Sequence, residues 1–355
     1  MGAILIFPID MYQSKNFYKT IKLLEQPVLL ASSEAGTVHR SAGDISYLPY
    51  VTAKNFEQEF LNFISEHNVS LMYAPHWGIW WRVKELIKTH SLNLKMCNES
   101  PFDMDCGSYR DAFCWAHSCL EPFSVHSSLM CRLPLSEALY ANLHRGYSHI
   151  PGQSDDEKIR LLVHIAKNSP DGDVIEIGSL YGRSSYALAF LANYHKIGNL
   201  ICIDPWRLSN ISDQGEGSDL LNEAVVTVDM EEIFTNFTVS VAGFDNVNYI
   251  RMPSTAAVSL YEKYAKIGNI SSSQFGVTDV AGEISILHID GNHAYEEVKS
   301  DIKNWGKLVK KGGWILLDDY LWEFGEGPKR AGDELLSSSD WSSAFCVGDT
   351  LCIQM

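Results

Sequence analysis

The chain has 355 residues and a formal net charge of −16. This length suggests two domains or one large one, and the acidic balance argues against a general nucleic-acid surface, which needs a basic face. No run of about 18 apolar residues occurs, so no membrane span is expected. The first ten residues lack the basic stretch of a signal peptide, which favours a cytoplasmic protein.

The first 120 residues alternate between predicted strands and helices. We predict strands over 3–9, 27–33 and 70–77, and helices over 14–24, 55–67 and 81–89. This alternation predicts a small parallel α/β domain over residues 1–120. Because it lacks a G-x-G-x-x-G loop, we predict no nucleotide site there. The aromatic cluster at residues 76–81 is expected to be mainly core, with a stacking surface for a sugar or an aromatic acceptor as the alternative.

Residues 98–150 are rich in Cys, His, Ser and aromatic side chains, and we predict helices and loops, with a helical linker over 121–150. His117 and His126 lie among five of the eight cysteines, which are Cys97, Cys106, Cys114, Cys119 and Cys131. These spacings contain no paired C-x-x-C knuckle. Reduced thiols of a cytosolic protein are therefore favoured over a zinc site.

A strand–glycine–helix motif follows a predicted helix over 154–167, for which Ser154 is the expected N-cap. Glu176 interrupts the apolar strand of this motif, where a charge is costly without partners, so we expect it to order the loop. Gly178 and Gly182 allow the backbone to approach a ligand and the helix to begin close to the strand. The next strand ends at Asp204, and an acid at that tip binds ribose hydroxyls in nucleotide-binding α/β folds.

The segment after Asp204 carries a long polar insertion. Trp206 either lines a pocket or covers the sheet. We predict one long helical insert over 218–241, a strand over 246–252 and a helix over 254–267, with Ser254 either a cap or a contact to an adenine ring. Residues 268–282 are expected to form a polar surface loop, with a substrate lid as the alternative.

The third motif spans residues 286–320, in which two predicted buried strands each end in acids. Asp290 follows the first strand, and Asp318 and Asp319 follow the second. Adjacent acids repel unless a cation or a donor separates them, and Mg²⁺ prefers oxygen ligands. This edge therefore predicts a hard-cation site. His293 is a candidate general base, because its unperturbed pKa lies near neutrality, although capping or packing is the alternative.

Taken in order, the segments EIGSLYGRSS, ICIDPW, HIDGNHAYEEV and GGWILLDDY resemble class I S-adenosylmethionine-dependent methyltransferases. The resemblance is to the group of macrocin-type sugar O-methyltransferases and cephalosporin-hydroxylase-like proteins, and it runs from Tyr147 to the C-terminus. It implies a Rossmann-like domain over 151–355 with a seven-stranded sheet, S-adenosylmethionine held by the glycine loop and the second-strand acid, and often Mg²⁺ at the far strand tips. Residues 147–153 are expected near the cofactor.

The motifs and the resemblance together give a set of expected site residues. The expected cofactor-binding residues are Glu176, Gly178, Ser179, Tyr181, Gly182, Ser184, Asp204, Ser254 and Asp290. His293 and Asp290 are expected to be catalytic, and Asp290, Asp318 and Asp319 to bind the metal. Tyr295 and Tyr320 lie near the same edge, as site residues or as packing. We thus predict Mg²⁺-assisted O-methylation of a hydroxyl on a sugar or small natural product. No nucleic-acid or membrane partner is expected, and the chain is predicted to form a homo-oligomer whose N-terminal domain helps select the acceptor.

Three alternatives stay open at this point. The first is a metal-independent methyltransferase of the same fold. The second is an oxygenase, although no two-His-one-carboxylate set is visible for iron. The third is a binding or scaffold protein with a degenerate cofactor fold, against which the intact Glu176, Gly178, Gly182 and Asp204 argue. A Rossmann dehydrogenase is disfavoured because GSLYGR does not fit G-x-G-x-x-G.

Overall fold

A computed structural model describes residues 2–40, 44–121, 132–210, 213–225, 227–338 and 341–355. The chain divides into two compact units, Met1–Arg110 and Asp111–Met355. Within the described residues, no helix combines the length and the apolar character that a membrane crossing requires.

The first unit is built on a five-stranded parallel sheet in the order β3-β2-β1-β4-β5. Its strands are β1 (Ala3–Ile6), β2 (Val28–Ser32), β3 (Ile45–Tyr47), β4 (Val69–Tyr73) and β5 (Lys95–Met96). Its helices are α1 (Tyr12–Ile21), α2 (Ala35–Arg40), α3 (Phe56–Glu66) and α4 (Trp77–Thr89), and α5 (Pro101–Leu120) contains the division between the units.

Side chains of the first unit pack on both faces of its sheet. Leu5 and Phe7 belong to the core shared with α3 and α4, whereas Ile4 and Ile6 pack with Ile21 of α1. This alternation is the period of two expected for a strand, and it confirms the predicted small α/β domain. The expectation that residues 76–81 are mainly core is wrong for Trp77 and Trp81, which are exposed at the start of α4.

The second unit is built on a seven-stranded sheet in the order β13-β14-β12-β11-β6-β7-β8. The strands are β6 (Asp173–Ile177), β7 (Leu200–Ile203), β8 (Val247–Ile250), β11 (Ile284–Ile289), β12 (Val309–Leu317), β13 (Ser343–Val347) and β14 (Thr350–Gln354). All neighbours pair in parallel except β14, which runs antiparallel to both β12 and β13. The predicted seven-stranded Rossmann-like sheet is thus confirmed.

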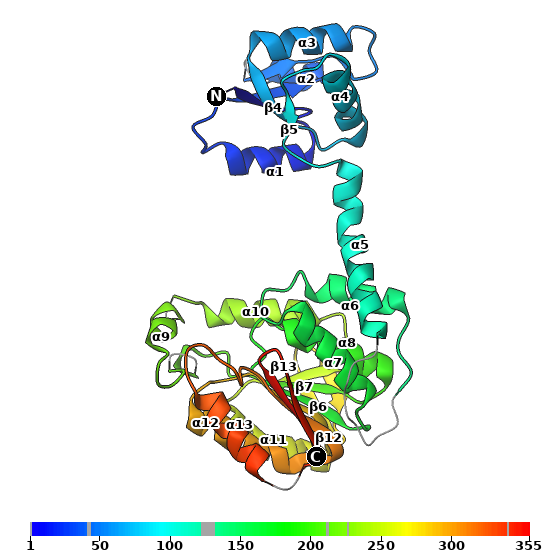
Figure 1. Cartoon of the computed structure of the whole chain (residues 1–355). Helices are drawn as coiled ribbons and strands as arrows, with labels where there is room; N and C mark the ends of the chain where they lie inside the picture. Colours follow the sequence, from blue (N-terminus) through cyan, green and yellow to red (C-terminus); the bar gives the residue numbers. More distant parts are fainter. Residues whose placement is uncertain (1, 41–43, 122–131, 211–212, 226, 339–340) are drawn as a thin grey trace. The chain divides into compact units, whose positions relative to one another are not determined.

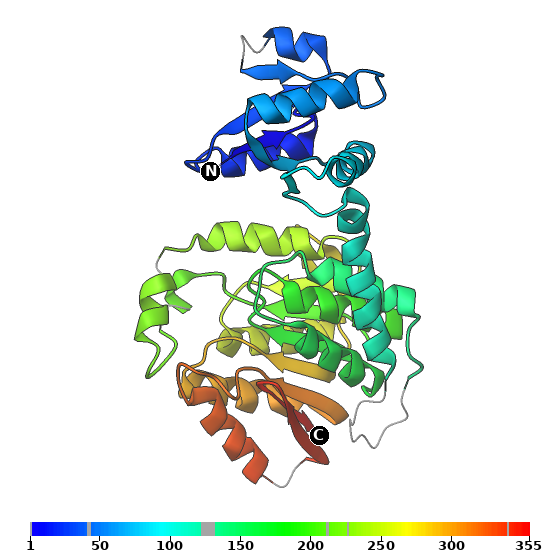
Figure 2. The ribbon, with the colours of Figure 1, turned by 45° about the horizontal axis from the view of Figure 1, so that its top comes forward.

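Helices cover both faces of this sheet (Figures 1 and 2). One face packs against α6 (Glu137–Tyr147), α7 (Asp156–Lys167), α8 (Arg183–His195) and α10 (Met230–Val241). The other face packs against α11 (Ser254–Ile267), α12 (Tyr295–Trp305) and α13 (Gly327–Ser337). A short α9 (Asp219–Val225) and two 3₁₀ turns (Leu208–Asn210 and Gly306–Leu308) complete the unit. Because both faces are covered, β6, β7 and β11 are buried along their whole length, and β7 is a continuous apolar run.

Three local predictions for this unit were wrong. The N-cap of α7 is Asp155, whose side chain accepts the backbone N–H of Lys158, and not Ser154. The insert over 218–241 forms two helices, α9 and α10, because Asp229 caps a new helix through the N–H groups of Glu231 and Glu232. Residues 268–282 contain a β-hairpin of β9 (Asn269–Ser272) and β10 (Gly276–Asp279).

The hairpin is anchored by a tertiary contact. The side-chain amide of Asn248, on the neighbouring β8, donates to the carbonyl of Gly276 at 3.1 Å and to the Thr278 hydroxyl at 3.2 Å. A polar segment without a hydrophobic period gives no strand signal of its own.

Candidate active site

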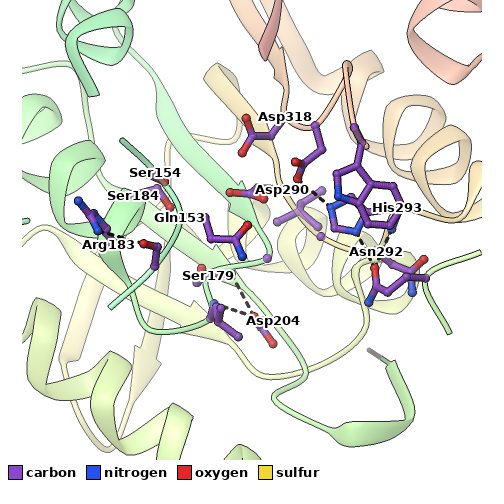
Figure 3. A pocket seen from close by; sticks show the side chains of 18 of the residues that line it. Gln153, Ser154, Ser179, Arg183, Ser184, Asp204, Asp290, Asn292, His293 and Asp318 are labelled. Atoms are coloured by element: carbon purple, nitrogen blue, oxygen red, sulfur yellow. Dashed lines mark hydrogen bonds and ion pairs between the residues drawn. The ribbon is translucent and has the colours of Figure 1, made fainter. Parts of the chain in front are cut away.

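A cavity of about 790 Å³ opens at the carboxyl ends of the central strands of the second unit. Gly178, Asp204, Asp290 and Asp318 all line it, and each is the first residue after a strand: β6, β7, β11 and β12 in turn. In an open parallel sheet, ligands bind at this edge. Figure 3 shows Arg183 and Ser184 on one side of the cavity and His293 and Asn292 on the other.

One end of the cavity is formed by the glycine loop and Asp204. One carboxylate oxygen of Asp204 accepts the backbone N–H groups of Ser179 and Leu180, both at 3.0 Å, and the other accepts that of Trp206 at 2.7 Å. Leu180 and Trp206 adopt positive φ angles of 45° and 43°. Residues other than glycine adopt this backbone conformation only at an energetic cost, and such residues cluster at functional sites. Asp204 therefore holds the loop in its shape and leaves its carboxylate at the cavity wall.

Gly178 lies where the ends of β6 and β11 approach each other closely. Its φ is 86°, in the left-handed region that favours glycine. A Cβ atom at this position would lie 1.9 Å from the carbonyl oxygen of Asp290. Glycine is thus required at position 178 for two reasons: the backbone has a positive φ, and the backbone after β11 leaves no space for a Cβ atom. This close approach brings Asp290 to the same cavity as the glycine loop.

Glu176 lies beneath the loop and not on the cavity wall. It is fully buried, and it accepts hydrogen bonds from Ser179 Oγ at 2.8 Å, from Ser185 Oγ and from His288 Nδ1 at 3.3 Å. Burial acts to raise the pKa of Glu176, and the bonds from His288 and the serines overcome it and hold the pKa below its usual value. The carboxylate therefore supports the loop from inside, as a positioning residue.

The other end of the cavity is formed around His293. Its Nδ1 lies 2.6 Å from Gln214 Oε1, which also accepts the His293 backbone N–H at 3.1 Å. Its Nε2 lies 2.8 Å from Asp319 Oδ2, and its ring stacks on Trp322 with the centroids 4.2 Å apart. Both ring nitrogens thus face oxygen atoms, and His293 and Asp319 form an imidazole–carboxylate pair. Asp319 has a positive φ of 53°, and this backbone turn after β12 directs its side chain toward His293.

Asp290 and Asp318 meet a residue that the sequence analysis did not select. The ammonium of Lys158, from the first turn of α7, lies 3.0 Å from Asp290 Oδ2 and in contact with Asp318 Oδ2. The other oxygen of Asp318 accepts the Thr350 hydroxyl at 2.6 Å. Burial opposes the charged form of Lys158, and the two carboxylates overcome it and raise the pKa of the ammonium. Burial and the neighbouring Asp318 raise the pKa of Asp290 well above its usual value.

The predicted magnesium ligands do not fit Mg²⁺ as they are arranged. Lys158 already bridges Asp290 and Asp318, and Asp319 is turned away toward His293. Among the described residues, two groups have possible ligand atoms within 4.8 Å of one another, namely His288–Asp290–Asp318 and Asp290–His293–Asp319. The first contains the Lys158 bridge, and the second includes a histidine nitrogen, whereas Mg²⁺ prefers oxygen.

A buried acid lies under the rim of the cavity at α12. Asp301 accepts a hydrogen bond from the hydroxyl of Ser254, and both residues line the cavity. Burial raises the pKa of Asp301 to about 7. Ser254 is therefore not the N-cap of α11: that position is Pro253, and the Ser254 hydroxyl bonds to Asp301 instead.

Asp301 is expected to make stability fall as pH rises. Because its folded pKa lies above its unfolded value, the folded state binds the extra proton between about pH 4 and pH 7. Above pH 7 the ionised Asp301 carboxylate destabilises the folded state by at most about 4 kcal/mol. Asp301→Asn should therefore raise the free energy of unfolding at pH 8 and leave it nearly unchanged at pH 4, measured by urea denaturation. Equal effects at both pH values would contradict the buried charge, and the exposed Asp245→Asn is the matched control.

The remaining predicted site residues divide into those at the cavity and those elsewhere. Ser179, Tyr181 and Ser184 line the cavity, as do residues 151–153. Gly182 is not part of the lining and is instead the N-cap of α8, with a φ of 87°. Trp206, Tyr295 and Tyr320 are not part of the lining: Trp206 is buried and donates its indole N–H to the Leu180 carbonyl, and the two tyrosines bond to acids of α13.

The cysteine-rich segment contributes to neither metal-ligand group among the described residues. Cys97 and Cys114 are exposed, and Cys119 is buried in the core of the second unit, where burial raises its pKa to about 12. Cys131 and His126 lie outside the described residues. The favoured reading of reduced thiols, partly in the core, is consistent with these positions.

Three residues of the site were missed by the sequence analysis: Lys158, Gln214 and Trp322. Only Lys158 carried a signal. It lies three, four and seven residues before Leu161, Leu162 and Ile165, which are all buried, so it is a lysine on the apolar face of a helix. Gln214 and Trp322 lie in irregular segments, and only the folded chain brings them to His293.

Comparison with known proteins agrees with this geometry. The family described as "Methyltransferase domain" matches residues 175–320. An uncharacterized protein, R132, of Acanthamoeba polyphaga mimivirus is 29% identical over 163 residues, which are 45% of this chain and 58% of the viral protein. The aligned part thus spans less than two thirds of that relative. The matched family segment begins in β6 and ends after β12, so it contains all four strand ends that line the cavity.

The solved structures that match include two methyltransferases of low sequence similarity. The O-methyltransferase NovP is 18% identical with a TM-score of 0.41, covering 56% of this chain and 79% of NovP. The MycE methyltransferase of the mycinamycin biosynthetic pathway, solved with Mg, SAH and mycinamycin VI, is 12% identical with a TM-score of 0.30, covering 52% of this chain and 44% of MycE.

Residues 175–320 of the second unit therefore belong to a methyltransferase domain, and the seven-stranded sheet that contains them is of the class I, S-adenosylmethionine-dependent type. The resemblance found in its motifs is confirmed by the family match, which covers the glycine loop, Asp204, Asp290 and the Asp318–Asp319 pair.

Proposed function

We propose that this chain transfers the methyl group of S-adenosylmethionine to a hydroxyl oxygen of a small molecule of the sugar or natural-product class. One observation carries the proposal: a single cavity joins the loop ordered by Asp204 to the His293–Asp319 pair. The first is suited to a nucleoside and the second to a hydroxyl that must lose a proton. The predicted homo-oligomer and cytoplasmic location stay predictions.

At the cofactor end, Asp204 would accept the ribose hydroxyls while it holds the loop. Gly178 allows the cofactor to pass close to the backbone, and Ser254 would lie toward the adenine ring. At the acceptor end, Trp322 and His293 present a stacked aromatic surface to the cavity, which suits the apolar face of a sugar or an aromatic ring.

The reaction would be an in-line displacement. The acceptor oxygen forms a bond to the methyl carbon as the bond from that carbon to the sulfonium sulfur breaks, and the electron pair stays on sulfur. The acceptor proton passes to the His293–Asp319 pair. The chain contributes mainly position and electrostatics.

Two versions of this function, Mg²⁺-assisted transfer and metal-independent transfer, differ in which cation lies at the acceptor end. The sequence favoured Mg²⁺, which when bound would lower the pKa of the acceptor hydroxyl. Asp290, His293 and Asp319 are the residues that a divalent ion would meet. The Lys158 bridge between Asp290 and Asp318 supports the metal-independent version instead.

The cofactor assignment is tested by binding. Asp204→Ala removes the acceptor of three loop N–H groups and of the ribose hydroxyls, so S-adenosylmethionine should bind more weakly by about 1–3 kcal/mol in calorimetry. The control is Asp245→Ala, which changes an exposed acid in the loop before β8. Wild-type protein that binds neither S-adenosylmethionine nor its demethylated product would remove the proposal.

The acceptor class is tested by transfer. Protein incubated with methyl-labelled S-adenosylmethionine and a panel of hydroxylated sugars, glycosides and phenols should label an oxygen of at least one class. Label found only on nitrogen, carbon or macromolecules would contradict the hydroxyl assignment while leaving cofactor binding intact.

A further inference from the structure

Lys158 is a buried cation at the acceptor end of the cavity. Its side chain is 9% exposed, and its position on the apolar face of α7 directs it toward the sheet. A lysine is almost never this buried unless it is paired. Asp155 caps the same turn by accepting the Lys158 backbone N–H at 2.8 Å, so the turn that carries the ammonium is itself fixed.

The ammonium lies where the two strand-end carboxylates converge. It is in contact with Asp318 Oδ2, and Asp290 Oδ2 lies 3.0 Å away. Two carboxylates at this distance from a shared point repel each other unless a cation lies between them. Thr350 occupies the remaining oxygen of Asp318 at 2.6 Å. Each oxygen of Asp318 therefore has a donor from within the chain.

An ammonium has three N–H donors in a compact head. Asp290 and Asp318 use two of them, and Lys158 also lines the cavity next to Asp290. The third donor is then available to an oxygen placed between Asp290 and the His293–Asp319 pair. A fixed positive charge at this point stabilises negative charge on that oxygen without solvent reorganisation.

We propose that Lys158 is the resident cation of the acceptor site, a catalytic residue that donates a hydrogen bond to the acceptor oxygen in the place where a divalent metal was expected. This inference rests on the proposed function and names the cation of that same site. Asp290 and Asp318 are positioning residues: they hold the ammonium and do not ligate a metal.

The step is balanced without a metal. The acceptor O–H bond breaks and its proton goes to the His293–Asp319 pair. The oxygen forms its bond to the methyl carbon, and the sulfonium becomes a neutral thioether. Lys158 keeps all three of its protons throughout, because it acts only as a hydrogen-bond donor.

The first experiment uses the wild-type chain; its binding measurements need no acceptor, and its transfer assay uses an acceptor found with the labelled panel. Mn²⁺, a paramagnetic substitute for Mg²⁺, is titrated in and its binding is followed by electron paramagnetic resonance, in parallel with calorimetry of S-adenosylmethionine. We expect cofactor binding without stoichiometric Mn²⁺ binding, and transfer at the full rate in excess chelator. Stoichiometric Mn²⁺ binding together with chelator-sensitive transfer overturns the proposal. Failure to bind the cofactor instead defeats the proposed function itself.

The second experiment removes the charge. Lys158→Met keeps the length of the apolar stem but leaves Asp290 and Asp318 without their cation. We expect turnover to fall by about 10²–10³-fold, the usual effect of losing one donor to a developing oxyanion, while the affinity for S-adenosylmethionine is retained. We also expect the variant to gain a Mn²⁺ site, which a purely structural lysine would not predict.

Two further variants complete the test. Lys303→Met changes an exposed lysine in the last turn of α12 and should behave as wild type in every assay. Lys158→Arg keeps the charge with a different donor geometry, and should exclude Mn²⁺ while restoring only part of the turnover. If Lys158→Met does not fold, the wild-type Mn²⁺ titration and the Lys158→Arg variant still test whether Lys158 is the cation of the acceptor site. An active Lys158→Met chain, or a Lys158→Arg chain that binds Mn²⁺, contradicts the proposal.

Discussion

His293→Ala is expected to lower kcat by about 10²–10⁴-fold, the range associated with losing a general acid–base group. The reason lies in the contacts of the ring: Nε2 lies 2.8 Å from Asp319 Oδ2, and Nδ1 is fixed by Gln214 at 2.6 Å. Without the imidazole, the acceptor proton has no paired site to enter. Steady-state kinetics with labelled S-adenosylmethionine, at saturating cofactor, measures the effect.

The interpretation depends on cofactor binding being retained, since His293 lies at the far end of the cavity from Asp204. Calorimetry of S-adenosylmethionine should therefore give a wild-type affinity. His293→Gln keeps hydrogen-bonding groups but cannot take up the proton, and it should therefore lose turnover to the same extent as His293→Ala. His117→Ala, at a histidine whose side chain is 71% exposed, is the matched control. Full turnover in His293→Gln would assign the proton to another group, with Asp319 as the first candidate.

Gly178→Ala is expected to destabilise the second unit and abolish cofactor binding. The new Cβ would have to occupy a position 1.9 Å from the Asp290 carbonyl oxygen, at a φ of 86°. Strain from the backbone and overpacking together cost on the order of 2–6 kcal/mol. Urea denaturation reports the stability loss. Cofactor binding should be lost because the glycine loop and the strand end after β11 must move apart. Calorimetry measures this loss.

A matched glycine separates the two causes. Gly268 ends α11 with nearly the same φ, 88°, and an added Cβ there meets no atom within 4 Å. Gly268→Ala should therefore show only the backbone strain, about 1–2 kcal/mol, and bind S-adenosylmethionine normally. If both variants lose the same stability, the close approach between Gly178 and Asp290 does not contribute, and the proposed geometry of the cofactor end is wrong at that point.

The two ends of the cavity are linked through the backbone as well as through space. The Asp290 carbonyl lies against Gly178, and the Asp290 side chain holds Lys158 at the acceptor end. A change at Asp290 should therefore affect cofactor and acceptor together, whereas changes at Asp204 or His293 should affect one end only. This link is short because β6 and β11 are neighbours in the sheet.

The sequence by itself determined the class of the second unit and one wall of its site. In each motif the functional residue directly follows a strand, as Gly178, Asp204 and Asp290 do. Predicting where the strand ends therefore also locates the functional residue. In a parallel sheet such positions meet at one edge whatever the loop lengths. The roles predicted for these side chains could therefore be stated before their distances were known.

Tertiary structure alone decided what these side chains meet. Lys158 reaches Asp318 across 160 positions of the chain, and Gln214 reaches His293 across 79. No periodicity or motif spacing encodes such contacts, because they depend on how helices and irregular segments pack over the sheet. The predicted magnesium ligands illustrate the consequence: the local pattern of acids is present, but packing of α7 brings an ammonium between two of them and the turn at Asp319 directs the third to a histidine. A cluster of like charges must be neutralised, and only the folded chain determines whether an ion or a side chain does so.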